Sequence, residues 1–179
     1  MKKVIVISGS IRHNSNSEVL ARQFAEGAKA ADHEVEYISL KNKTISYCIG
    51  CLACQQTQKC VIKDDAWEIV SKCKDADVIA FATPIYYYAV CGQLKTLFDR
   101  FNPLYISDYR FKEFYLLTAA AEEEAHVADG AITELKGLIA CFPKSALKGV
   151  LCGLGIHMGG AVASRQDLLD AAFEMGKNV

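Results

Sequence analysis

The chain has 179 residues, of which 51% are hydrophobic and 23% are charged, and its formal net charge at pH 7 is −1. This length suits one domain with a single substantial core. The near-neutral charge and the high apolar content argue against a disordered chain and against nucleic-acid binding by bulk charge. Eight cysteines need a separate explanation.

The start of the chain indicates the compartment in which these cysteines lie. The apolar run at 4–7 is too short for the core of a signal peptide. No stretch approaches the roughly 18 apolar residues of a membrane helix. We therefore expect a cytoplasmic protein without membrane attachment, and metal binding or redox chemistry explains its cysteines better than structural disulfides do.

Apolar periodicity predicts alternating strands and helices along the chain. A buried strand at 4–7 is followed by a helix at 17–31 and by a half-exposed strand at 34–40. The later pattern predicts a helix at 65–74, a strand at 77–82, a helix at 92–101, a strand at 114–118, a helix at 129–140, a strand at 149–154 and a helix at 164–176.

Five strands that alternate with helices predict an α/β fold, a three-layer sandwich around a five-stranded parallel sheet. We interpret residues 1–179 as one domain. The segment 47–64 follows neither period, and it is predicted to be a cysteine-rich loop insert. Ligands of such sheets bind at the carboxyl ends of the strands where the strand order reverses, so the loops after the first, third and fourth strands are the candidate site.

The loop after the first strand has the composition of an anion site. Hydroxyls, amides, a guanidinium and a helix N-terminus lie within ten residues, from Ser8 to Ser17. The loop lacks both the Gly-Lys-Ser/Thr ending of a P-loop and the G-x-G-x-x-G of a dinucleotide loop. An ordinary capped turn between strand and helix is the alternative.

The segment Ser8-Gly9-Ser10-x-Arg12-x-x-Ser15-Asn16-Ser17 resembles the FMN phosphate loop of the flavodoxin-like NAD(P)H-dependent FMN reductases. Further agreement comes from residues 83–88, from 92–100 and from the glycine-rich last strand with the helix that follows it. The resemblance implies a flavodoxin-like strand order 2-1-3-4-5, bound FMN, NAD(P)H as co-substrate, and a homodimer or homotetramer with the flavin near a subunit interface.

The resemblance also implies the residues that contact FMN. Those expected at the phosphate are Ser8, Ser10, Arg12, Asn14, Ser15, Asn16 and Ser17, and those expected at the flavin ring are Pro84, Ile85, Tyr86, Tyr87, Thr118, Ala119 and Ala120. Packing in the core or at an interface is the alternative for the tyrosines. No catalytic side chain is expected, because flavin N5 carries the chemistry. His157 is a candidate interface or substrate contact.

The insert contains the pattern Cys48-x2-Cys51-x2-Cys54-x5-Cys60. This spacing is close to the cysteine run of ferredoxins, and it resembles the iron-sulfur flavoprotein branch of the same family, which implies a [4Fe-4S] cluster. Zinc, a redox disulfide and free thiols are the alternatives. The remaining cysteines, Cys73, Cys91, Cys141 and Cys152, are expected to be small core residues.

These features predict an FMN-dependent oxidoreductase that passes electrons between NAD(P)H, or a ferredoxin-type donor, and an acceptor such as a flavin or quinone. The alternative is a non-enzymatic thiol-redox or zinc-binding module on the same scaffold. Neither reading involves nucleic acid or a membrane.

Overall fold

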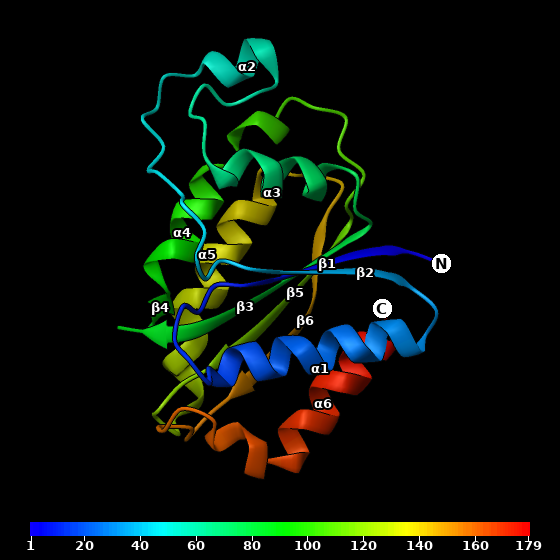
Figure 1. Cartoon of the computed structure of the whole chain (residues 1–179), viewed down its shortest axis with the longest axis vertical. Coiled ribbons are helices and arrows are strands. Elements are labelled where there is room, and N and C mark those ends of the chain that lie inside the picture. The colour runs from blue at the N-terminus through cyan, green and yellow to red at the C-terminus, as the bar shows by residue number, and fades with distance from the viewer.

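Five parallel strands form the centre of the molecule, in the order β2-β1-β3-β5-β6 (Figure 1). The computed structural model describes residues 1–179. The strands are β1 (Lys3–Ser8), β2 (Glu34–Ser39), β3 (Val78–Tyr86), β5 (Glu113–Ala119) and β6 (Ala146–Gly153). With the parallel strands numbered along the chain, this order is 2-1-3-4-5, so the expected strand order is confirmed.

Helices cover both faces of the sheet, since its central strands are apolar on both sides. On one face α1 (Asn16–Ala30) and α6 (Gln166–Lys177) pack together, as Figure 1 shows. The other face carries α3 (Asp65–Lys74), α4 (Gly92–Asp99) and α5 (Asp129–Ala140). The three-layer sandwich is therefore confirmed, and α3 and α5 have the predicted bounds.

A sixth, short strand was not predicted. β3 continues through Pro84 to Tyr86, beyond the expected end at residue 82, and β4 (Ala89–Val90) pairs with it antiparallel. Tyr87 and Tyr88 form the turn, with φ values of 50° and 66°. Asn and Gly are the usual residues in such a two-residue turn, so nothing in the local sequence signals this hairpin.

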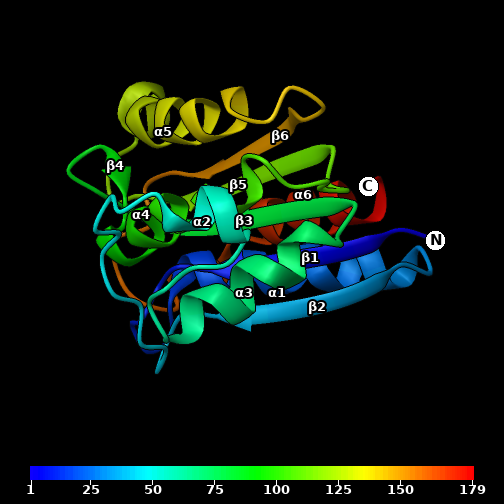
Figure 2. The same cartoon turned by 90° about the horizontal axis from the view of Figure 1, so that it is seen from above.

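The insert also contains an unpredicted helix, α2 (Ala53–Thr57), whose 5 residues are too few to show a period. Figure 2 shows α2 in front of the sheet when the molecule is seen from above. Three 3-10 helices, η1 (Asn102–Leu104), η2 (Ala125–Ala128) and η3 (Ala161–Ser164), lie in other connections. None of the helices has the length and hydropathy that crossing a bilayer requires.

Two glycines allow α1 and α6 to touch through their backbones. A Cβ on Gly27 would lie 1.9 Å from the carbonyl oxygen of Phe173, and one on Gly176 would lie 1.9 Å from that of Phe24. Any larger residue must push the helices apart. This contact fixes α1, whose first turn borders the candidate site.

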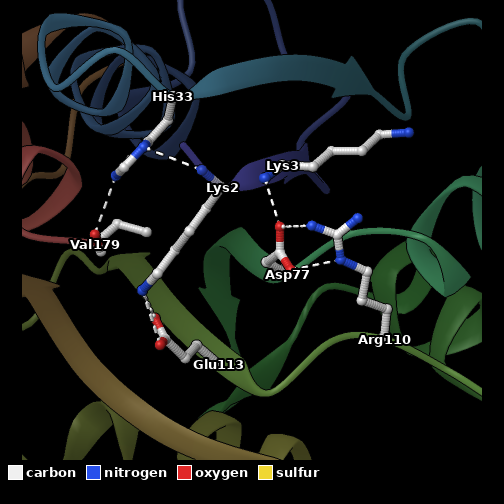
Figure 3. A network of polar contacts seen from close by, with 7 residues as sticks. All are labelled: Lys2, Lys3, His33, Asp77, Arg110, Glu113 and Val179. Atoms are coloured by element: carbon white, nitrogen blue, oxygen red, sulfur yellow. Dashed lines mark hydrogen bonds and ion pairs between the residues drawn. The ribbon is translucent and has the colours of Figure 1, made fainter.

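The amino-terminal end of the sheet is joined by polar contacts between distant segments (Figure 3). Lys2 Nζ lies 2.9 Å from a carboxylate oxygen of Glu113. Asp77 accepts two hydrogen bonds of 2.6 Å from Arg110 and one of 2.7 Å from the backbone N–H of Lys3. These contacts hold β1, β3 and β5 together at the end opposite the candidate site.

The cysteines outside the insert fall into two pairs. Cys73 and Cys91 are buried, as expected. The expectation is wrong for Cys141, which is exposed, and for Cys152, which is half-buried. Cys141 caps the end of α5, where the chain leaves the core, and Cys152 lies on β6, an edge strand that is covered less completely.

Candidate functional site

A cavity of about 110 Å³ opens where the strand order reverses, at the carboxyl ends of β1 and β3. The loops after β1, β5 and β6 and the end of β3 surround it. Its lining consists of Ser10, Arg12, Ser15, Asn16, Ser17, Pro84, Ile85, Tyr86, Ala119, Ala121, Ile156 and His157. Ligands of α/β sheets bind at this place.

The loop before α1 presents unpaired backbone donors. Ser15 is the N-cap, and its hydroxyl accepts a hydrogen bond from the N–H of Glu18 and lies 3.1 Å from the hydroxyl of Ser17. The backbone N–H groups of residues 13–17 have no acceptor within the protein. Together with the helix dipole they form a cradle for an anion, and Arg12 adds a positive charge at its rim.

Asn16, a predicted phosphate contact, lines the cavity, and its side chain is paired within the protein. Its side-chain NH₂ donates to the carbonyl oxygens of Ile156 and Met158, at 3.3 and 2.9 Å, and its Oδ1 accepts from the N–H of Val162 at 3.2 Å. Both ends of the amide are therefore occupied. Asn16 ties the loop after β6 to the start of α1, so its side chain braces the cavity wall.

Close packing fixes the start of the loop after β1, next to Ser10 in the cavity lining. The N–H of Gly9 donates to the carbonyl oxygen of Ala82 at 2.8 Å, and the Cys91 thiol donates to the carbonyl oxygen of Gly9 at 3.3 Å. A Cβ on Gly9 would lie 2.9 Å from Cys91 Sγ, closer than real Cβ atoms approach. Glycine is therefore required here, and the thiol of Cys91 supports the loop from below.

The structure brings most of the predicted FMN contacts together and leaves others outside. Ser8 and Thr118 are buried within their strands, Ala120 is buried behind the cavity, and Asn14 and Tyr87 are exposed; none of the five lines the cavity. Ala121, which directly follows the predicted contacts at 118–120, also lines it, and so does Ile156, which was not predicted. His157, which the sequence marked only as a general candidate contact, also lines it. The signal for Ala121 is its place in the same run of three alanines, 119–121.

A second cavity, of about 20 Å³, lies between the cysteine insert and residues 99–103 at the end of α4. All four cysteines of the predicted motif line it, together with Arg100 from the end of α4. Cys54 is buried, whereas Cys48 and Cys51 are exposed. No group of three or more His, Cys, Asp or Glu side chains is placed to hold a single metal ion. The four thiols thus surround a cavity and do not converge on one point.

The thiols are close enough to influence one another electrostatically. Burial raises the pKa of Cys54, and the nearby sulfurs of Cys60, Cys48 and Cys51 raise it further, since neighbouring thiolates repel. Four thiolates at this place need positive charge to be stable. This donor set suits a multinuclear cationic core, because four cysteine thiolates are the usual ligands of a [4Fe-4S] cluster.

A buried ion pair anchors the insert to α4. Arg100 donates to both carboxylate oxygens of Asp64, at 2.7 and 2.9 Å, and to the carbonyl oxygen of Ser46 at 2.8 Å. Burial alone would raise the pKa of Asp64, but hydrogen bonds from Arg100 and from the N–H of Ser46 outweigh it and lower the pKa. Arg100 thus has a structural contact, and Asp99 pairs with Lys95 on the surface.

A doubly covered parallel sheet in this order, with an anion cradle after its first strand, defines a flavodoxin-like protein. A family model described as NADPH-dependent FMN reductase matches residues 2–145. The chain therefore belongs to the NADPH-dependent FMN reductase family, and the expected family is confirmed.

Relatives named as iron-sulfur flavoproteins are also similar. One from Methanocaldococcus jannaschii is 44% identical over 104 residues, which is 58% of this chain and 54% of that protein. One from Archaeoglobus fulgidus is 36% identical over 110 residues, 62% of this chain and 54% of that protein. The chain thus spans about half the length of these curated relatives. A candidate NAD(P)H-dependent FMN-containing oxidoreductase of Bacillus subtilis is 28% identical, with 95% of this chain and 94% of that protein covered.

Solved structures share the fold. An NAD(P)H:quinone oxidoreductase from Methanothermobacter marburgensis superposes with a TM-score of 0.78 at 20% identity, covering 99% of this chain and 95% of that one. A flavodoxin from the domain Archaea gives a TM-score of 0.61 at 13% identity, covering 98% of this chain and 94% of that one. The flavodoxin-like fold is confirmed.

Proposed function

We propose that this protein is an FMN-dependent oxidoreductase that transfers electrons between NAD(P)H or a ferredoxin-type donor and an acceptor such as a flavin or quinone. The observation that carries the proposal is the cavity at the carboxyl end of the sheet, where the backbone N–H groups of Ser15, Asn16 and Ser17 have no acceptor within the protein. Membership in the FMN reductase family supports FMN as the occupant.

The phosphate of FMN would be held at the start of α1. The free N–H groups there supply several donors at the positive end of the helix dipole. Ser15 and Ser17 add hydroxyls, and Arg12 adds a charge-assisted hydrogen bond. Because Asn16 is already paired with the loop after β6, its contribution is the shape of this wall.

The flavin ring would lie against the end of β3 and the start of the loop after β5. Pro84, Ile85 and Tyr86 form one wall of the cavity. Ala119 and Ala121 face it with small side chains, which let the backbone come close to a flat ring. Bound FMN would supply the hydride-accepting N5, and these residues would orient the ring and exclude water from it.

We extend the proposal to the insert, where Cys48, Cys51, Cys54 and Cys60 would hold a [4Fe-4S] cluster. The four thiols line one cavity, and the chain resembles relatives that are named iron-sulfur flavoproteins. A bound cluster would supply one-electron transfer, whereas the flavin also handles electron pairs. Thiol redox chemistry at the same cavity is the second candidate function, because Cys48 and Cys51 are exposed free thiols.

We also propose a homodimer or homotetramer in which the hairpin of β3 and β4 borders another subunit. Tyr87 at its tip is 100% exposed, and Tyr86 beside it lines the cavity. Large apolar side chains that project beside a ligand site are typical of interaction surfaces. Light scattering of the purified protein gives the mass of the assembly, and a monomer would contradict this part of the proposal.

Anaerobic purification followed by three measurements tests the function. We expect the two-banded visible absorption of flavin, FMN released on denaturation, and oxidation of NAD(P)H when a quinone or free flavin is added. Iron and acid-labile sulfide in the same sample support the cluster. A colourless protein that carries only zinc, or no metal, would favour the non-enzymatic module.

A further inference from the structure

Arg100 is the residue of the main domain that enters both the cysteine cavity and the anchor of the insert. It lies directly after α4 and is the C-cap of that helix. Its guanidinium lines the cavity that the four cysteines surround. The side chains of Arg100 and Asp64 are only 2% and 3% exposed, so this cation is held away from water.

The guanidinium is held in one orientation from two sides. One edge makes a bidentate pair with Asp64, which itself accepts hydrogen bonds from the backbone N–H groups of Ser46 and Ala66, at 2.8 and 3.1 Å. The carbonyl oxygen of Ser46 accepts another hydrogen bond from Arg100. Such a planar fork, paired on a fixed carboxylate, presents its remaining donors in a defined direction.

One of those donors points at a cysteine. Arg100 Nη2 donates to Cys60 Sγ at 3.3 Å, and Cys60 is the one cysteine of the motif whose sulfur receives a hydrogen bond. Cys60 is also the cysteine separated from the others by the longest spacer. The buried Nε–H of Arg100 has no acceptor within the protein, so a further donor is free beside the cavity.

We propose that Arg100 is a positioning residue for the metal centre: it fixes Cys60 as the fourth ligand and stabilises negative charge on the cysteine-bound group. This inference rests on the proposed function, in which the four cysteines hold an anionic iron-sulfur cluster. It adds a residue that the cysteine pattern does not contain.

The physical reason is that hydrogen bonds from a cation to a ligand sulfur stabilise the more negative form of the centre. Reduction adds negative charge, so the bond raises the reduction potential. Partners of metal ligands also hold them in place, and their loss typically weakens metal binding by about 10- to 100-fold. Arg100 therefore affects both the retention of the centre and its potential.

The test compares Arg100→Gln with Asp64→Asn in full-length, anaerobically purified protein. Iron and sulfide per chain, the rate of iron loss to a chelator and the reduction midpoint of the cluster are measured, and FMN content and thermal unfolding report on the fold. We expect Arg100→Gln to lose iron about 10-fold faster or more. Its midpoint should be more negative than that of the unmodified protein.

Asp64→Asn separates this role from that of a structural ion pair. It loosens the same anchor but removes a negative charge and keeps the cation, so its midpoint should shift in the positive direction. Arg100→Lys keeps the positive charge but loses the planar guanidinium. Compared with Arg100→Gln, it should bring the midpoint closer to that of the unmodified protein, with a smaller recovery of iron retention. Arg110→Gln removes another bidentate Arg–Asp pair, far from the cysteines, and should change neither quantity.

Two results would overturn the inference, and they are distinguishable. If the unmodified protein contains no iron and sulfide, the cluster part of the proposed function fails and the inference fails with it. In the second case the unmodified protein holds the cluster, while Arg100→Gln and Asp64→Asn both retain iron as well as it does and have the same midpoint. Only the role of Arg100 is then refuted.

Discussion

The proposed phosphate loop, residues 9–17, and the cysteine insert, residues 47–64, are the two chemically specialised segments, and they are built in opposite ways. The loop joins a buried strand to a long helix, and its Ser15, Asn16 and Ser17 are buried. In the insert, between residues 47 and 63, backbone hydrogen bonds are confined to α2 and its ends. Large apolar side chains of the insert, Tyr47, Ile49, Leu52 and Val61, are exposed.

The two segments differ in what orders them, that is, in what offsets the conformational entropy lost when a binding site forms. The phosphate loop is ordered by the fold itself, so its donors are in place before a ligand arrives. The insert has the Arg100–Asp64 anchor and few other contacts, so the proposed cluster would supply much of its order. We therefore expect changes at the insert to leave the flavin site intact, and changes under α1 to affect the whole domain.

The largest expected effect is at the insert. Cys54→Ala removes the one buried thiol of the motif and should abolish iron and sulfide binding, while FMN content stays unchanged. Limited proteolysis should then cut within residues 47–64. Cys141→Ala, which removes an exposed thiol outside the insert, is the control. Full retention of iron by Cys54→Ala would show that this cysteine is not a ligand.

The next effect is on the scaffold under the phosphate loop. Gly176→Ala places a methyl group against the backbone of Phe24, so the two helices must separate. We expect a loss of about 3 kcal/mol in the free energy of unfolding, measured with denaturant. Gly137→Ala in α5 meets no atom within 4 Å and should be neutral or slightly stabilising. Equal stability of the two variants would contradict the close contact.

Arg12→Ala should weaken FMN binding without changing the fold. A charge-assisted hydrogen bond contributes about 1.5–3 kcal/mol, which corresponds to a Kd raised at least about 10-fold. Flavin fluorescence titration of the apoprotein measures this. Ser17→Ala should weaken FMN binding to a smaller extent. Unchanged FMN affinity in both variants would show that this loop does not bind the phosphate.

Acid should weaken the anchor of the insert. Because Asp64 has a lowered pKa in the folded protein, its stabilisation is present above the ordinary carboxyl pKa of about 4 and is lost as the pH falls through the lowered value. Between pH 7 and pH 3, the difference in unfolding free energy between the unmodified protein and Asp64→Asn should therefore shrink. A difference that stays constant would show that Asp64 is not shifted.

The smallest effect concerns the hairpin turn. Tyr87→Asn places a residue that tolerates positive φ at a position with φ 50°, and it should stabilise the protein by about 0.5–1 kcal/mol. The same change should weaken any assembly that uses the exposed ring. Thermal unfolding and light scattering report the two effects separately, and a variant that is less stable would contradict the strain at this turn.

The sequence was sufficient for the regular part of the fold. Buried β-branched strands and amphipathic helices carry their own period, so α3 and α5 were predicted to the residue. The hairpin at Tyr87 was not predicted, because the pairing of β3 with β4 imposes a positive φ that tyrosine disfavours. The same limit applies to the sites: the motif indicated Asn16, but the contacts that occupy its amide come from residues 156–162, which are adjacent only in the fold.

α4 is a spacer between the two specialised segments. Its N-cap is Cys91, whose thiol donates a hydrogen bond to Gly9, and its C-cap is Arg100, which donates to Cys60. Its 8 residues correspond to a rod of about 12 Å. Within one subunit, the distance between the loop after β1 and the cysteine cavity is therefore set by the rise of a rigid helix, and adding one turn would lengthen it by about 5 Å.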